Sequence, residues 1–109
     1  MKERRKYVRI KTNYKVDYSR LSENGKMIDE GEAQTEDVSK SGACLKLDKF
    51  INEGTVLNLK IYNKLHEKPI DCSARIVWMK KERDNYFICG LDFTRIGWIE
   101  SDKLFKNPD

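Results

Sequence analysis

Two short motifs in the first half of the chain carry groups that could bind an anionic nucleotide. The first is R-R-x-x-x-R, formed by Arg4, Arg5 and Arg9. The second is D-x-S-x-x-G, formed by Asp37, Ser39 and Gly42. Guanidinium groups make paired hydrogen bonds with phosphate oxygens or with the O6/N7 edge of guanine. A carboxylate can accept from the N1 and N2 donors on the opposite edge of guanine, and a hydroxyl can add one more bond.

Each motif also has a purely structural interpretation. With 22 Lys and Arg among 109 residues, R-x-x-x-R also describes a solvated basic arm. D-x-S-x-x-G also describes an Asx-turn at a strand end, in which Gly42 would supply a positive φ. Asp37 and Ser39 are two residues apart, so on a strand their side chains would share one face. The order of the motifs, with room between them for a strand, a turn and a second strand, favours one joint site.

The composition indicates a single small domain with a polar surface. Hydrophobic residues make up 39% and charged residues 37% of the 109 residues, enough for one core. The net charge of +4 suits an anionic partner without requiring nucleic acid. No apolar run approaches the ~20 residues of a membrane span, and the N-terminus lacks the apolar region of a secretory signal. We therefore expect no membrane span and a cytoplasmic location.

Alternation of apolar and polar residues predicts an all-β fold. Six segments carry this pattern, and the polar one near 31–38 is the weakest. The segments are 14–19, 31–38, 43–47, 57–61, 70–76 and 87–93. Short strands joined by regular turns predict a small six-stranded antiparallel β-barrel. We expect one domain over 1–109, with a flexible arginine-rich arm at 1–12, the barrel at 13–95 and a short C-terminal helix at 96–107.

Several other residue types could carry chemistry, but their spacing favours structural roles. The odd number of cysteines and the absence of C-x-x-C argue against a disulfide framework and a metal site, so Cys44, Cys72 and Cys89 are expected to be small buried residues. His66 is the only histidine, which argues against a metal site. No nucleophile motif is present, so we expect no catalytic residues.

Three further residues are candidates for ligand contact. Tyr7 could stack on a base or dock the arm on the barrel. Trp78 continues the alternation of 70–76, which favours packing in the core or at the barrel mouth over ligand stacking. Gly90 lies in the last predicted strand.

The two motifs, followed by A-R-I-V-W at 74–78 and C-G-L-D-F at 89–93, resemble the PilZ family over nearly the whole chain. The resemblance implies a β-barrel that binds the bacterial second messenger cyclic di-GMP on its outer surface, with no other cofactor. It implies that Arg5 and Arg9 contact phosphates and guanine, opposite Asp37, Ser39 and Gly42. It also implies that Arg4 holds a second, intercalated ligand, which gives two ligands per chain.

The expected function is that of a receptor without catalytic activity. Cyclic di-GMP would bridge the arginine arm to the Asp37 and Ser39 face, and the remodelled surface would engage an unidentified protein partner. Two alternatives remain open. One is a PilZ-like adaptor that docks to proteins without binding nucleotide. The other, less favoured, is a general nucleic-acid-binding barrel that uses the basic arm and tyrosines.

Overall fold

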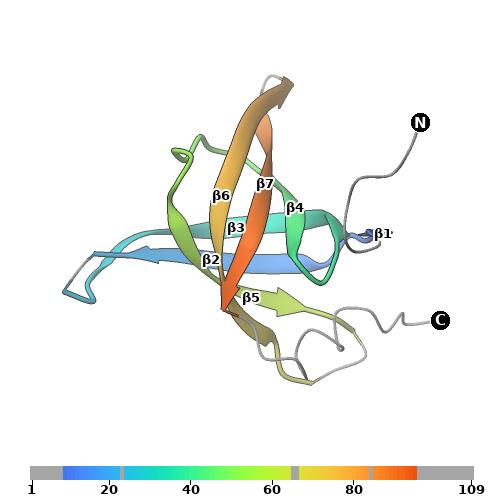
Figure 1. Cartoon of the computed structure of the whole chain (residues 1–109), viewed down its shortest axis with the longest axis horizontal. Coiled ribbons are helices and arrows are strands. Elements are labelled where there is room, and N and C mark those ends of the chain that lie inside the picture. The colour runs from blue at the N-terminus through green and yellow to red at the C-terminus, as the bar shows by residue number, and fades with distance from the viewer. Residues whose placement is uncertain (1–8, 23, 65–66, 84, 96–109) are drawn as a thin grey trace.

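The computed structural model describes residues 9–22, 24–64, 67–83 and 85–95, and these form seven β-strands (Figure 1). The strands are β1 (Ile10–Lys11), β2 (Lys15–Leu21), β3 (Met27–Val38), β4 (Gly42–Leu47), β5 (Val56–Tyr62), β6 (Ile70–Arg83) and β7 (Tyr86–Arg95). The predicted helix at 96–107 lies outside the described residues. Within the described ranges there is no helix that is long and apolar enough to cross a membrane.

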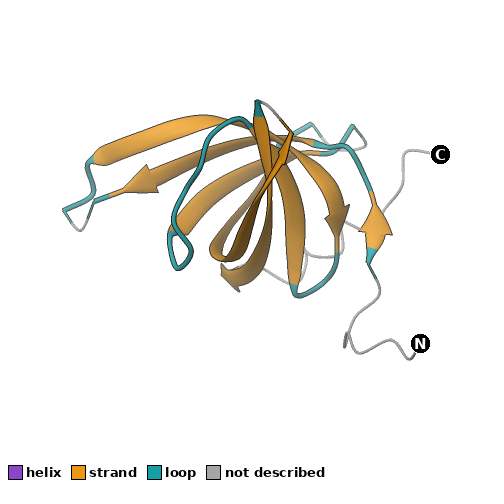
Figure 2. Cartoon of the chain, turned by 90° about the horizontal axis from the view of Figure 1, so that it is seen from above, coloured by secondary structure: helices purple, strands orange, loops and turns teal. Residues whose placement is uncertain are grey.

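Six of these strands close into an antiparallel barrel. Their order is β3-β2-β5-β6-β7-β4, and β4 returns to pair with β3. The six-stranded barrel predicted from the alternation is therefore confirmed. The added strand, β1, lengthens the sheet at the edge of β3. The β2–β3 hairpin extends well beyond the barrel (Figures 1 and 2).

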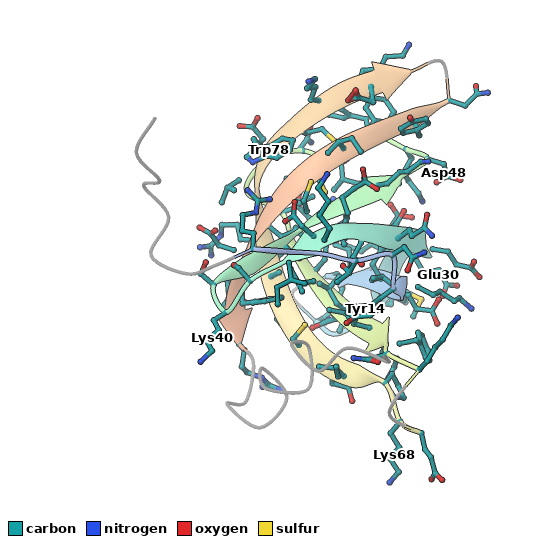
Figure 3. All side chains as sticks on the ribbon, turned by 90° about the vertical axis from the view of Figure 1, so that its right-hand side faces the viewer. Tyr14, Glu30, Lys40, Asp48, Lys68 and Trp78 are labelled. Atoms are coloured by element: carbon teal, nitrogen blue, oxygen red, sulfur yellow. The ribbon has the colours of Figure 1, made fainter. Side chains whose placement is uncertain are left out.

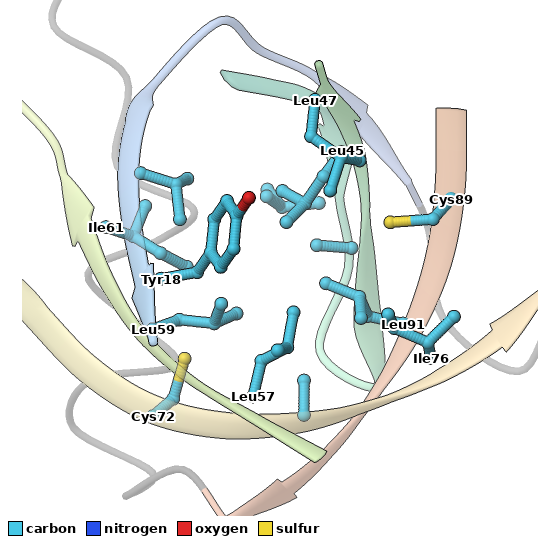
Figure 4. Close-up of a cluster of buried hydrophobic side chains, with 14 of the residues drawn as sticks. Tyr18, Leu45, Leu47, Leu57, Leu59, Ile61, Cys72, Ile76, Cys89 and Leu91 are labelled. Carbon is cyan, nitrogen blue, oxygen red and sulfur yellow. The ribbon is translucent and has the colours of Figure 1, made fainter. Parts of the chain in front are cut away.

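The alternating apolar residues fill the barrel (Figure 4). In β5, for example, Leu57, Leu59 and Ile61 are buried while the residues between them are exposed. Burial of one such side chain contributes about 1.5–3 kcal/mol to the free energy of folding. All three cysteines are buried free thiols, as predicted.

Two strands are longer than the alternation indicates. β3 begins at Met27 because Met27 and the polar residues after it pair with β2 in the projecting hairpin. β6 continues beyond Ile76 as far as Arg83 because it keeps pairing with β7. In both cases the ladder of backbone hydrogen bonds outweighs a weak side-chain pattern.

Ile10 and Lys11, near the end of the arm predicted to be flexible over 1–12, belong to the sheet, which corrects the expectation for these residues, while 1–8 lie outside the described residues. Ile10 pairs with Val38 in β1. Thr35, buried in β3, accepts a hydrogen bond from Tyr14 N at 2.8 Å and shares one with the Thr12 hydroxyl at 2.6 Å. These bonds fix the chain from Ile10 to Tyr14 against β3. Because of these bonds, Arg9 lies at one end of β3, beside the second motif.

Irregularities in β3 and β6 change which face the following side chains occupy. In β3 the register with β4 shifts between Thr35 and Asp37, so Glu36 is an extra residue. In β6 the register with β7 shifts between Ile76 and Trp78, so Val77 is an extra residue. A β-bulge of this kind moves the next side chain to the opposite face of the sheet. Both bulges border the region described next.

Candidate functional site

Arg9 and Asp37, one from each motif, form an ion pair. Arg9 donates from Nε and Nη2 to Asp37 Oδ1, at 2.8 and 2.6 Å. Their side chains are 28% and 21% exposed, so the pair is only partly open to solvent. The β3 bulge is needed for this geometry. Without it, Asp37 would share the parity of the buried Thr35 and point into the core.

The rest of the second motif forms a tight turn between β3 and β4. Ser39 Oγ accepts hydrogen bonds from the backbone N–H groups of Ser41 and Gly42, each at 3.2 Å. Ser39 N donates to Gly42 O at 2.8 Å. Ser39 lies beyond the end of β3, so the expected shared strand parity with Asp37 does not hold. Its hydroxyl holds the turn together, in the manner of serine turn motifs.

Glycine is required at position 42 for a reason other than the predicted positive φ. Positive φ angles occur, among the described residues, at Gly25 and Gly54, and Gly42 is not one of them. Instead, Gly42 lies in β4 against β7, where a Cβ would overlap the carbonyl oxygen of Leu91. Phe93 N donates to Ser41 O at 2.8 Å and ties the same turn to β7. The glycine is therefore required for close backbone approach.

The outer surface beside this turn is a row of four residues from four adjacent strands. Asp37 on β3 pairs with Cys44 on β4, Cys44 pairs with Gly90 on β7, and Gly90 pairs with Trp78 on β6. A Cβ at Gly90 would overlap the Trp78 indole, so the ring lies across this glycine. The β6 bulge leaves Val77 and Trp78 42% and 40% exposed. Trp78 is therefore on the surface, so of the two packing positions expected for it, the core is excluded.

Cys44, the cross-strand neighbour of Asp37, adds an uncharged side chain beside the ion pair. Burial, followed by the charge of Asp37, raises the pKa of the Cys44 thiol to about 11. The thiol therefore stays protonated near neutral pH and acts as a small apolar group.

These residues enclose a pocket of about 190 Å³ on the outside of the barrel. We call it the candidate pocket. It is lined by Arg9, Ser39, Ser41, Gly42, Ala43, Val77, Trp78, Gly90, Leu91 and Asp92. Figure 3 shows Trp78 and Lys40, which lies within the turn, on one side of the molecule, away from Glu30 and Asp48. The pocket combines a cation, an aromatic ring, hydroxyls and exposed backbone, which are the groups that bind a nucleotide base and its phosphate.

The structure thus brings together five of the predicted site residues, with a sixth paired to one of them. The lining includes Arg9, Ser39, Gly42, Trp78 and Gly90, and Asp37 is bound to Arg9. Arg4, Arg5 and Tyr7 lie outside the described residues. Sequence reasoning missed Ser41, Val77 and Asp92. Asp92 was discoverable, because alternation places it on the same face as Gly90, whereas Val77 is exposed only through the bulge.

Among the described residues, no group of three or more His, Cys, Asp or Glu side chains could hold a metal ion. His66 lies outside those residues.

Three solved structures with the same fold were compared with this chain. An inhibitor of motility from Bacillus subtilis (MotI/DgrA) has a TM-score of 0.76 and 19% identity, covering 94% of this chain and 48% of that one. The PilZ domain of YcgR from Escherichia coli, solved with c-di-GMP, has a TM-score of 0.71 and 15% identity, covering 94% and 86%. The complex of MrkH from K. pneumonia with c-di-GMP has a TM-score of 0.65 and 14% identity, covering 94% and 49%.

This chain spans about half the length of the Bacillus and MrkH proteins. At these identities the similarity establishes the fold. No curated protein sequence matches the chain significantly. The PilZ domain family, however, matches residues 3–104, which is nearly all of the 109 residues. Both motifs and both late strands fall inside that match, and the chain therefore belongs to the PilZ domain family.

Proposed function

We propose that this protein is a receptor for cyclic di-GMP and that the candidate pocket holds a guanine of that ligand. The observation that carries the proposal is the meeting of Arg9, Asp37 and Trp78 around one pocket. Family membership and the two similar structures named with c-di-GMP support the choice of ligand.

The pocket size suits a base better than a whole dinucleotide. Its volume of about 190 Å³ is below the roughly 300–1,000 Å³ of pockets that enclose drug-sized ligands. One guanine would stack on Trp78 inside the pocket, and the phosphates would lie over Arg9 on the open surface. Arg4 and Arg5 would supply further phosphate contacts, and a second intercalated ligand would use Arg4. The remodelled surface would then engage a protein partner.

The ion pair suggests how binding would change the protein. Arg9 uses Nε and Nη2 for Asp37 Oδ1, so part of its donor set is occupied before the ligand arrives. A phosphate could replace this carboxylate at Arg9, because both accept paired guanidinium hydrogen bonds. Asp37 would then be available to accept a hydrogen bond from a guanine N–H group of the ligand. The ligand would exchange one ion pair for two ligand contacts, with little net loss of hydrogen bonds.

Titration calorimetry with cyclic di-GMP tests this function, with GTP and GMP as controls. We expect saturable binding of cyclic di-GMP at two ligands per chain, and much weaker binding of the linear nucleotides. A ratio of one would remove the second ligand and leave the receptor function intact. No binding of cyclic di-GMP would overturn the proposal. Tight, strongly salt-dependent binding of long RNA or DNA in its place would indicate a nucleic-acid-binding barrel.

A further inference from the structure

We infer that Asp92 selects guanine over adenine in the candidate pocket. The inference rests on the proposed function, because it assigns a role within the same pocket. Asp92 is an exposed residue of β7 and lines the pocket together with Arg9 and Trp78. Asp37, the acceptor that the sequence motif indicates, is bound by Arg9 in the free protein and is not among the residues that line the pocket, whereas Asp92 is.

The position of Asp92 is fixed by the backbone around it. In the sheet it pairs with Gly42 on β4 and with Arg75 on β6. Gly42 has no side chain to cover the carboxylate, and the Phe93 N–H holds Ser41 beside it through the 2.8 Å bond to Ser41 O. Asp92 therefore stands at the rim between the turn and β7, on the same face as Gly90.

The carboxylate of Asp92 has no partner within the part of the chain that the structure describes. None of the hydrogen bonds or ion pairs between described residues involves its side chain, although Arg75 is its direct cross-strand neighbour. A carboxylate without a partner among the described residues repels an anionic ligand at this pocket unless the ligand offers it hydrogen-bond donors. Guanine presents such donors at N1 and N2. Adenine has no N2 amino group and carries a lone pair at N1, so it would face the carboxylate with an acceptor.

Two explanations of the role of Asp92 predict opposite changes in ligand affinity for the variant Asp92→Asn. If Asp92 accepts from guanine, Asp92→Asn weakens cyclic di-GMP binding, because the new amide points a donor at the donors of the base. We then expect a loss of about tenfold or more, the scale of one unmatched hydrogen bond. If Asp92 only repels phosphate, the same substitution strengthens binding of cyclic di-GMP and of every other anionic ligand.

The experiment is calorimetric titration of wild type and Asp92→Asn with cyclic di-GMP and with cyclic di-AMP. We expect the preference for cyclic di-GMP to fall, with weaker binding of cyclic di-GMP and unchanged or stronger binding of cyclic di-AMP. Asp48→Asn makes the same change of charge on the opposite side of the molecule, and it should leave the preference unchanged (Figure 3). Thermal melts should show that both variants are folded.

Arg75→Gln distinguishes direct contact from an effect through the neighbouring cation. If Asp92 acted by positioning Arg75, this variant would reproduce the loss of preference, and we expect that it does not. Unchanged or stronger cyclic di-GMP binding by Asp92→Asn overturns the inference while leaving the receptor function in place. Failure of the wild-type protein to bind cyclic di-GMP overturns both.

Discussion

Two depressions of this molecule differ in size and in chemistry, and the smaller one is lined by residues of both sequence motifs. The larger, here called the acidic groove, has a volume of about 860 Å³ against about 190 Å³ for the candidate pocket. Its charged lining residues are Asp17, Glu30, Glu32, Asp71, Lys60 and Arg95. Because carboxylates outnumber cations there, the groove repels an anionic ligand despite its size. Volume alone would select the acidic groove, whereas the motif residues line the candidate pocket.

The backbone beneath the two depressions differs as well. Under the acidic groove, the pairing of β2 with β5 and of β5 with β6 runs without a register shift. Two of its carboxylates are already bonded, since Lys60 Nζ lies 2.9 Å from Asp71 Oδ1 and Tyr62 donates to Asp17 at 2.9 Å. The candidate pocket lies between the two bulges. The acidic groove therefore has a regular centre with register shifts at its margins, beside Met27 and Ser73, whereas the shifts at the candidate pocket adjoin Asp37 and Trp78 themselves.

Arg9→Ala gives the strongest contrast between the two faces. We expect cyclic di-GMP binding to weaken by about 2–5 kcal/mol, the scale for removing one partner of a desolvated charge pair. The thermal melting temperature should fall little, because the pair with Asp37 is partly exposed. Arg9→Lys should also weaken binding, since an ammonium cannot reproduce the two-pronged contact.

The matched control is Arg95→Ala, which removes an exposed arginine from the acidic groove. Calorimetry should show cyclic di-GMP affinity close to that of the wild-type protein. Equal losses in the two variants would mean that the arginines act only through overall charge, and the distinction between the faces would be lost.

Gly42→Ala tests whether the backbone of the candidate pocket is as constrained as its contacts indicate. The new Cβ would overlap the Leu91 carbonyl, which is backbone and cannot rotate away. We expect a loss of about 3 kcal/mol in the free energy of unfolding, at the upper end of overpacking costs. Denaturant unfolding without ligand measures it.

Gly31→Ala is the corresponding change in the acidic groove. There the Cβ would meet the far end of the Tyr18 side chain, whose hydroxyl has no hydrogen-bond partner among the described residues. A side chain can shift where a carbonyl cannot, so the loss should be smaller than for Gly42→Ala. The opposite order would contradict the assignment of Gly42 to close strand packing.

Regular alternation explains why the barrel was predictable and the details of the pocket were not. The inward positions of β5 and most of β6 follow a period of two, and the sequence displays it directly. A bulge leaves no such signature. Extrapolating the β6 pattern past Val77 placed Trp78 in the core or at the barrel mouth, and extrapolating the β3 pattern placed Ser39 on the face of Asp37.

The two motifs indicated the candidate pocket because they depend on residue types and on their order along the chain. A shift in the register between strands changes neither. The motifs could not show that Arg9 and Asp37 bind each other in the free protein, since that contact depends on the Thr35 hydrogen bonds and on the bulge at Glu36. Nor could they indicate Asp92, which belongs to neither motif. The alternation of β7 does place Asp92 on the face of Gly90, but pairing between distant strands brings it beside Arg9 and Trp78, and a single sequence does not display that pairing.

Trp78→Ala has the smallest expected effect and tests the stacking surface itself. The indole is 40% exposed and lies across Gly90, so its removal should change the free energy of unfolding little. Base–aromatic stacking contributes about 1–3 kcal/mol, and we expect a loss of cyclic di-GMP affinity in the lower part of that range because the ring is open to solvent. Tyr62→Ala removes an exposed aromatic ring that contacts the groove residue Asp17, and it should leave affinity unchanged. If both substitutions leave binding intact, the base does not stack on Trp78. The ligand would then be held by Arg9 and the turn alone, and the bulge at Val77 would serve only the fold of the strand.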